Sequence, residues 1–159
     1  MKSIVHDSPV GPLTLHSDGV ALTGLEFDDP KYPLEPSPRG EDGVLNAARR
    51  QLDRYFTDKL RVFDLPLAPL GTPFQQRVWA ALLEIPYGVT RSYGALAAAI
   101  GAPKASRAVG LANGRNPISI IVPCHRVIGA NGSLTGYGGG MERKRQLLDL
   151  EQGEPLIRC

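Results

Sequence analysis

A chain of 159 residues, 42% of them hydrophobic and 21% charged, has the composition of one globular domain or of two small ones that share a core. No apolar stretch approaches the roughly 20 residues of a membrane-spanning helix, and residues 1–7 lack the apolar segment of a signal peptide, so we expect a cytoplasmic protein without membrane contact. The net charge of +2 is unevenly distributed, because residues 1–70 hold eight basic and eleven acidic side chains, whereas residues 71–140 hold six basic ones and one acidic one. A basic, acid-poor middle is equally consistent with a phosphate-rich partner and with a solvated surface.

Residues 1–71 predict a small N-terminal α/β domain. Short apolar runs on either side of a Ser-Asp-Gly turn indicate a β-hairpin over residues 12–27. The proline-rich residues 28–42 are typical of an exposed loop. Residues 43–57 show the three- and four-residue spacing of an amphipathic helix, and residues 63–67 are a candidate for one more strand.

A second domain is expected to begin at residue 72 and to extend to residue 159. Its first helix has a clear start, because Thr72 is a candidate N-cap, Pro73 fits the first helical position and Gln75 completes a capping box. The Pro-Tyr-Gly sequence at residues 86–88 ends this helix.

Two short helices are expected next. Ser92 can cap an alanine-rich helix over residues 93–100, and a basic helix over residues 104–113 follows after a Gly-Ala-Pro turn. This pattern is typical of a helix-turn-helix, whose second helix contacts DNA. Many helical hairpins inside protein cores look the same, so the pattern alone leaves DNA binding open.

The segment around Cys124 carries the candidate chemistry. Residues 118–122 form an apolar, strand-like run that leads to Cys124, and a glycine-rich segment separates it from a last helix over residues 141–151. A lone cysteine after such a run is usually a small buried hydrophobe. The adjacent His125 can supply a base, however, and Arg126 adds positive charge that favours a thiolate. These residues by themselves leave a reactive and an inert Cys124 equally open.

Cysteine and histidine are too few for a disulfide framework or a metal site. The second cysteine is the last residue, Cys159, and of the three histidines only His125 lies near a cysteine. Because immediate neighbours in a chain seldom bind one metal ion together, we expect no metal.

The residues around Cys124 resemble the active-site signature of the O6-alkylguanine-DNA alkyltransferases, also called methylated-DNA–protein-cysteine methyltransferases. The signature lies at residues 121–128, which read IVPCHRVI. Further segments resemble the same family, in the same order and without insertion: PFQQRVW at 73–79, PYGVTRSY at 86–93, SRAVG at 106–110, Asn-Pro at 116–117 and LLDLE at 147–151. The specific resemblance covers residues 72–151, and over residues 1–71 it is only general.

The resemblance implies catalytic roles for five residues. Cys124 would take the alkyl group from guanine O6 in a single displacement, after His125 accepts the thiol proton through a water. Glu151 would orient His125 and stabilise its cation, as the third group of a triad does. Asn116 would brace the turn that carries the cysteine, and Tyr93 would donate a proton to the departing guanine. Without the resemblance, a solvated carboxylate, a loop asparagine and a packed ring are the simpler interpretations of these last three residues.

The resemblance also implies how DNA would be bound. The second helix of the pair would lie in the minor groove of double-stranded DNA without sequence specificity, and Arg107 would fill the place of a flipped-out base. Further DNA contacts are expected from Ser92, Lys104, Ala105, Ala108, Arg115 and Arg126. The pocket for the base would be formed by Gly136, Tyr137, Gly138 and Gly139, with a glycine at 138 where family members often have serine.

The implied fold is an α/β N-terminal domain, ribonuclease H-like with a small antiparallel sheet and a helix, followed by a mostly α, winged-helix-like C-terminal domain. The product would be a stable thioether. One molecule would therefore repair one O6-alkylguanine, or one O4-methylthymine, without a cofactor. We expect a monomer that can bind DNA cooperatively.

Three other functions fit parts of the sequence. A lesion-binding, alkyltransferase-like protein would lack the cysteine that this chain has at position 124. A thiol hydrolase would need a catalytic histidine distant in sequence, and a transcription factor would leave Cys124 inert. Repair explains all of the motifs, and binding without transfer is the main alternative.

Overall fold

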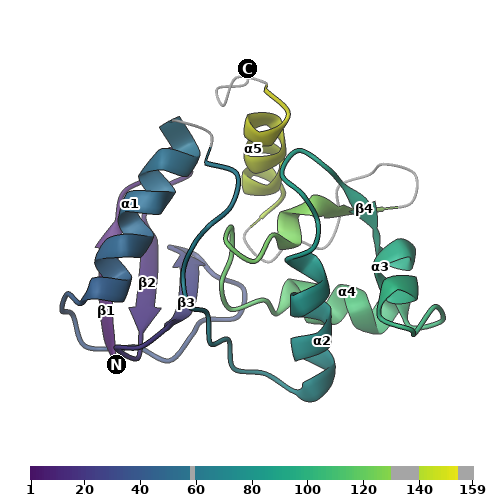
Figure 1. The fold of residues 1–159 in the computed structure, drawn as a ribbon, viewed down its shortest axis with the longest axis horizontal. Coiled ribbons are helices and arrows are strands. Elements are labelled where there is room, and N and C mark those ends of the chain that lie inside the picture. Colours follow the sequence, from purple (N-terminus) through teal and green to yellow (C-terminus); the bar gives the residue numbers. More distant parts are fainter. Residues whose placement is uncertain (58–59, 130–139, 154–159) are drawn as a thin grey trace. The chain divides into compact units, whose positions relative to one another are not determined.

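The computed structural model describes residues 1–57, 60–129 and 140–153 (Figure 1). Contacts between Cα atoms divide the chain into two compact units, of which the first consists of Met1–Leu70 and Pro117–Ile121 and the second of Gly71–Asn116 and Val122–Cys159. The chain therefore passes from the first unit to the second after Leu70, one residue before the boundary predicted between residues 71 and 72. Five residues of the predicted second domain, Pro117–Ile121, belong to the first unit.

The first unit is a three-stranded antiparallel sheet with a helix packed against it. The strands are adjacent in the order of the chain, β1 (Lys2–His6), β2 (Leu13–Ser17) and β3 (Leu22–Phe27), and α1 (Gly43–Thr57) contacts all three (Figure 1). The hairpin, the helix and the antiparallel sheet confirm the predicted α/β fold of this region. Its core contains the side chains that alternate along the strands and recur along one face of α1: Leu13, Leu15, Leu25, Leu45, Leu52 and Tyr55.

The strand predicted at residues 63–67 is absent. Leu67 forms a single parallel bridge with Leu22 of β3, in which Leu22 donates to the carbonyl of Pro66 at 2.8 Å. The ladder does not extend, because a proline has no N–H to donate to a neighbouring strand.

The strand predicted at residues 118–122 is a turn. Leu25 of β3 donates to the carbonyl of Pro117 at 2.9 Å and accepts from Ser119 N at 3.1 Å, which places this segment with the first unit. Ile120 then has a φ of 72°, a left-handed conformation that costs a residue other than glycine about 1–3 kcal/mol. The segment is buried as predicted, but it turns before it reaches Cys124.

The second unit is mainly helical, as predicted. Its helices α2 (Pro73–Leu82), α3 (Tyr93–Ala99) and α4 (Ser106–Gly114) contact one another (Figure 1), and α5 (Met141–Glu151) contacts the short segment that carries Cys124. The described part of the chain contains no helix that is both long and apolar enough to cross a membrane.

The starts of these helices follow from local sequence. Thr72 Oγ1 accepts from Gln75 N at 3.1 Å and Gln75 Oε1 accepts from Thr72 N at 2.9 Å, so the predicted capping box is present. Ser92 caps α3 by accepting from Ala95 N at 3.0 Å. The helix predicted from residue 104 begins at Ser106, because the chain is still in a turn at residues 102–105.

Trp79 fixes α2 against α4. Its indole Nε1 donates to the carbonyl of Ala112 at 2.9 Å, and the ring is 2% exposed. The chain passes over this ring at Gly71, where a Cβ atom would lie 2.3 Å from a ring carbon. Only glycine allows so close an approach.

Candidate active site

Cys124 lies in a single turn of 3-10 helix, η1 (Cys124–Arg126), and is 3% exposed. η1 continues directly into β5 (Val127–Ile128), which pairs in parallel with β4 (Arg91–Ser92). Because β4 leads into α3, this strand pair ties the cysteine segment to the start of α3.

Two asparagines hold the backbone on either side of the cysteine. Asn116 Nδ2 donates to the carbonyl of Val122 at 2.7 Å, which suits a residue that braces the turn. Asn113 Nδ2 donates to the carbonyl of Cys124 itself at 3.3 Å. Asn113 is 1% exposed and was not predicted as a site residue. Its spacing of three residues before Asn116, near the end of α4, is the signal that could have revealed it.

A buried carboxylate joins His125 to Arg126. His125 Nε2 lies 2.7 Å from Glu151 Oε2, and both side chains are completely buried. Arg126 binds the same carboxylate with two donors, Nε to Oε1 at 2.7 Å and Nη2 to Oε2 at 3.0 Å. Such a fork fixes the carboxylate and satisfies its charge. The sequence predicted that Glu151 orients His125, and the structure brings these two residues together.

The carboxylate determines which nitrogen of His125 carries the proton. Burial by itself would raise the pKa of Glu151, but the charges and hydrogen bonds of His125 and Arg126 outweigh it and hold the pKa well below its ordinary value. An ionised carboxylate only accepts, so His125 Nε2 is the donor and Nδ1 is the basic nitrogen. Nδ1 is buried and has no hydrogen-bond partner among the residues that the structure describes.

The DNA contact predicted for Arg126 is wrong. Its side chain is buried, and a third donor, Nη1, bonds to the carbonyl of Ile85 at 2.6 Å. A guanidinium whose donors are committed to a buried carboxylate and a buried carbonyl cannot bind a phosphate at the surface. Its partner Glu151 lies 25 residues away in the chain, so local sequence could not reveal the pairing.

Lys144 is a second site residue that was not predicted. It lies on α5, is 0% exposed, and places its Nζ 5.9 Å from the centre of the Tyr93 ring. Burial lowers the pKa of Lys144 to about 8, while negative charge on Cys124 acts in the opposite direction. The spacing of Lys144, Leu147, Leu148 and Glu151 along one face of α5 is the signal that could have revealed it.

The other predicted catalytic residue, Tyr93, begins α3. Its ring is half-buried and lies against Gly110 of α4, where a Cβ atom would be 3.7 Å from two ring carbons. The ring therefore lies against α4, and the Lys144 ammonium lies 5.9 Å from the centre of the ring.

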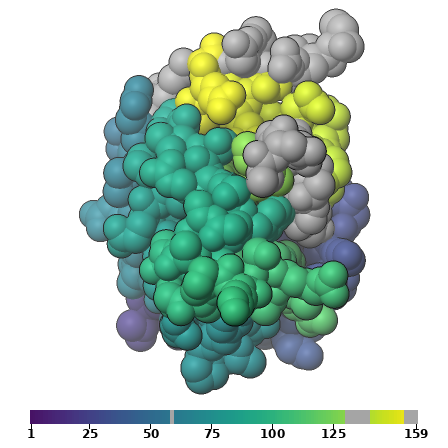
Figure 2. Space-filling view, turned by 90° about the vertical axis from the view of Figure 1, so that its right-hand side faces the viewer, coloured from purple at the N-terminus to yellow at the C-terminus, as the bar shows by residue number. Residues whose placement is uncertain are grey.

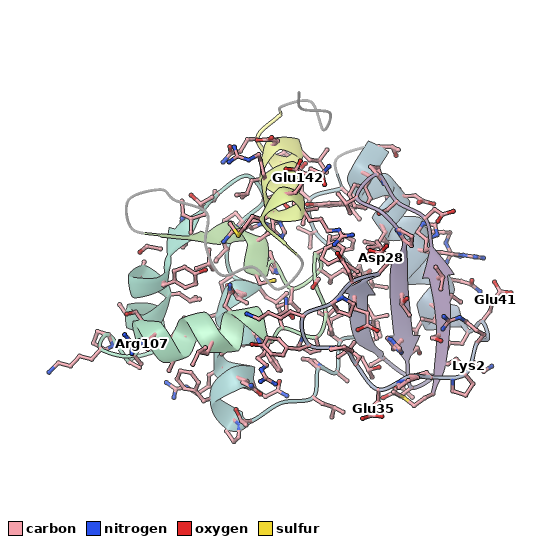
Figure 3. The ribbon with its side chains drawn as sticks, turned by 180° about the vertical axis from the view of Figure 1, so that it is seen from behind. Lys2, Asp28, Glu35, Glu41, Arg107 and Glu142 are labelled. Carbon is pink, nitrogen blue, oxygen red and sulfur yellow. The ribbon has the colours of Figure 1, made fainter. Side chains whose placement is uncertain are left out.

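The remaining predicted DNA contacts lie on or beside α3 and α4, whose teal and green surface is turned toward the viewer in Figure 2. Arg107 is exposed near the start of α4 (Figure 3), and Lys104, Ala108 and Arg115 are also exposed. Ala105 is half-buried, and the hydroxyl of Ser92 is occupied as the cap of α3. The predicted pocket residues Gly136, Tyr137, Gly138 and Gly139 lie outside the described residues.

The ionisable side chains of the site do not form a metal centre. Within residues 1–57, 60–129 and 140–153, no three His, Cys, Asp or Glu side chains are grouped so that they could hold a metal ion. The arrangement supplies a buried thiol at Cys124 and a neighbouring base, His125, whose tautomer is fixed by Glu151. It also contains two buried cations, Arg126 and Lys144.

Two family models match the chain. Residues 1–69 match "6-O-methylguanine DNA methyltransferase, ribonuclease-like domain", and residues 73–153 match "6-O-methylguanine DNA methyltransferase, DNA binding domain". Together they cover nearly all of the sequence.

Individual relatives are similar over nearly the same length. A methylated-DNA–protein-cysteine methyltransferase of Mycobacterium tuberculosis is 60% identical over 147 residues, which are 92% of this chain and 89% of that protein. One of Methanosarcina acetivorans is 55% identical over 153 residues, 95% of this chain and 98% of that protein. The crystal structure of Mycobacterium tuberculosis OGT in complex with DNA has a TM-score of 0.92 and 55% identity, and the match covers 98% of this chain and 96% of that one.

Proposed function

The chain belongs to the 6-O-methylguanine DNA methyltransferase family, and we propose that it repairs O6-alkylguanine in DNA by moving the alkyl group irreversibly to Cys124. One observation carries the proposal: a buried cysteine is followed by a histidine bound to an ionised carboxylate, in a chain 60% identical to a methylated-DNA–protein-cysteine methyltransferase. Binding of double-stranded DNA is supported by the family and by the relative whose structure contains DNA.

The reaction begins with the loss of the thiol proton of Cys124. His125 Nδ1 is suited to accept it through a water, because Nε2–H is already engaged by Glu151. The hydrogen bonds of Asn113 and Asn116 to neighbouring carbonyls keep the backbone of the nucleophile in place while this happens.

The alkyl group then passes to sulfur in one displacement. A C–S bond forms as the bond between the alkyl carbon and guanine O6 breaks, and the electron pair of the broken bond stays on the base. Tyr93 donates a proton to that base, and the proton that Cys124 lost returns to the tyrosine through His125 and solvent. The resulting thioether has no ready leaving group, so each molecule acts once and needs no cofactor. O4-methylthymine carries the same type of O-alkyl bond and would be a second substrate.

The two helices α3 and α4 would act as a helix-turn-helix, with α4 in the minor groove and without sequence specificity. A base inside a duplex cannot reach a buried sulfur, so it must be flipped out. The exposed Arg107 is suited to fill the gap, and the small Ala108 beside it lets the helix backbone approach the DNA closely. Lys104 and Arg115 would contact phosphates, while Ser92 and Ala105 would lie at the edge of the same surface.

The flipped base would be enclosed by Gly136, Tyr137, Gly138 and Gly139. With glycine at position 138, backbone amides rather than a serine hydroxyl would bond to guanine O6. We further propose that the protein works as a monomer in the cytoplasm and binds DNA cooperatively.

The main alternative is a protein that flags alkylated bases without repairing them. Such a protein has no use for a nucleophile, whereas this chain has Cys124 beside a base of fixed tautomer. A hydrolase is disfavoured because His125 directly follows Cys124 in the chain and points its Nε2 at Glu151.

Cys124→Ser separates repair from binding. The variant and the wild type are each mixed with a duplex that contains one O6-methylguanine, and both the lesion that remains and the DNA that is bound are measured. The wild type should remove the methyl group, whereas the variant should bind the duplex as tightly but leave the lesion intact. Tight binding by the wild type without loss of the lesion would favour the flagging protein.

A further inference from the structure

Leu111 is a large apolar side chain on the exposed side of α4. The helix packs against α2 and α3 and buries Val109, Ala112 and Asn113. Leu111, in contrast, is 66% exposed. It lies four residues after Arg107, which is about one helical turn, so both side chains share the exposed side of the helix. A single exposed leucine is common on protein surfaces, but this one lies on the side that the proposed function turns toward DNA.

The exposed side of α4 is cationic at both ends and apolar in the middle. Arg107 is exposed near its start and Arg115 at its end, about 12 Å apart along the helix. Between them the exposed residues are Ala108 and Leu111. The sequence contains no acidic residue from position 85 to position 141. This pattern suits a nucleic-acid groove, which has phosphates along both edges and sugars between them.

An α-helix does not fit an unaltered minor groove. With its side chains a helix is about 10–12 Å across, whereas the minor groove of B-DNA is about 6 Å wide. At Ala108 the small side chain lets the backbone come close to the DNA. Leu111, about one turn further along, adds three carbon atoms, so the groove must open where this side chain enters.

We propose that Leu111 is an apolar wedge, a side chain that enters the minor groove and holds its walls apart one helical turn from Arg107. The inference rests on the proposed binding of α4 in that groove. It goes further because opening a groove costs a free energy that depends on the stiffness of the DNA. Leu111 therefore makes repair depend on the sequence beside the lesion, although it reads no base and does not touch the alkyl group.

The contact made by Leu111 differs from those of the cations in its response to salt. Each phosphate contact releases counterions, so its share of the affinity falls as salt is added, whereas burial of an apolar side chain releases none. Leu111→Ala should therefore weaken duplex binding about tenfold at low and moderate salt alike. Lys104→Ala should instead reduce the slope of log affinity against log salt by about one.

Duplexes that differ only in the order of A·T pairs test the wedge itself. A·T and T·A pairs present the same acceptors in the minor groove, but a run of adenines has a narrow, stiff groove, whereas T-A steps are flexible. One O6-methylguanine is flanked on both sides by runs of adenine or by alternating thymine and adenine. The rate of methyl transfer is measured at limiting protein, and affinity is measured on the same duplexes with unmodified guanine.

Three proteins are compared: the wild type, Leu111→Ala and Leu83→Ala, which changes an exposed leucine at the end of α2. The wild type should prefer the alternating flanks by at least about threefold in both measurements. Leu111→Ala should bind less tightly and lose most of this preference, because alanine needs less opening of the groove. Leu83→Ala should match the wild type. Because Leu111 is exposed, Leu111→Ala should fold normally and react with free O6-methylguanine at the wild-type rate.

The wedge is overturned if the wild type has no preference for the alternating flanks, or if Leu111→Ala keeps that preference. Equal weakening of binding in Leu83→Ala and Leu111→Ala would overturn it as well. If the binding results agree with the wedge but the wild type removes no methyl group, the proposed function fails while the DNA contact of Leu111 stands.

Discussion

Glu151→Gln keeps the shape of the side chain but removes the charge on which three buried donors converge. The wild-type carboxylate accepts from His125 Nε2 at 2.7 Å and from Arg126 Nε and Nη2 at 2.7 and 3.0 Å. A glutamine has one carbonyl oxygen, so at least one donor must then face an NH2 group. Arg126 would also lose its counter-charge while remaining buried.

The expected loss of stability is large. Breaking a buried ion pair by removing one partner costs about 3–5 kcal/mol, against a total stability of roughly 5–15 kcal/mol for a domain. For a chain of this length the melting temperature should fall by about 6–20 °C. Because the pKa of Glu151 is lowered in the folded state, its contribution is complete above the ordinary value of 4.5 and is lost as the pH falls. The variant should therefore lose less of its stability than the wild type when acidified.

Transfer should slow for a separate reason. A neutral glutamine no longer stabilises the imidazolium that forms when His125 takes the thiol proton, so His125 becomes a weaker base. Loss of a general base typically slows a reaction by about 10²- to 10⁴-fold. The rate is measured with a methylated duplex under single-turnover conditions, on protein shown to be folded at the assay temperature.

Urea unfolding of Glu151→Gln, of Arg126→Met and of the double variant separates charge from packing. The double variant removes both buried charges and should recover much of the stability of Glu151→Gln, although the carbonyl of Ile85 then lacks its donor. If the double variant recovers stability but not transfer, Glu151 has two distinct roles. One is to neutralise the buried charge of Arg126, and the other is to support His125 as the base. A folded Glu151→Gln within about 1 kcal/mol of the wild type, with an unchanged rate of transfer, would refute the reasoning.

Further variants test other parts of the structure. The unfolding free energy of the wild type should rise between pH 8 and 10.5, because the unfolded chain keeps a Lys144 proton that the folded state has lost, and Lys144→Met should lack this rise. Asn113→Ala removes the bond to the carbonyl of Cys124 and should cost about 1–3 kcal/mol in urea unfolding while slowing transfer; an unchanged rate would show that the bond does not position the sulfur. Arg107→Ala should slow repair in duplex DNA far more than reaction with free O6-methylguanine, and equal slowing would argue against a role in base extrusion. Gly71→Ala should lower stability by about 1–3 kcal/mol through overpacking against Trp79, whereas Gly43→Ala, with open space around it, should not.

The sequence predicts those elements whose cause is local. The capping box of Thr72 and Gln75 lies within four residues, and the apolar spacing over residues 43–57 is complete within one helix. Cys124, His125 and Glu151 are identified by the family resemblance, and the structure joins the last two at 2.7 Å.

The features that sequence alone misses depend on distant partners or on single-residue geometry. An apolar run such as residues 118–122 looks like a strand until Ile120 adopts a positive φ. Arg126 looks like a surface cation because Glu151, which buries it, is 25 residues away. Lys144 looks solvated because lysine is rarely buried, and its surroundings come from α3 and η1 rather than from its own helix.

The central claim is that Cys124 receives the alkyl group, once and permanently. The measurement is the mass of the intact protein during titration with a duplex that contains O6-methylguanine, followed by fragmentation to locate the added group. We predict a gain of one methyl group per protein molecule, located on Cys124, with no further repair after one equivalent of lesion. Continued removal of methyl groups beyond one equivalent, or a methyl group on any other residue, would contradict this account.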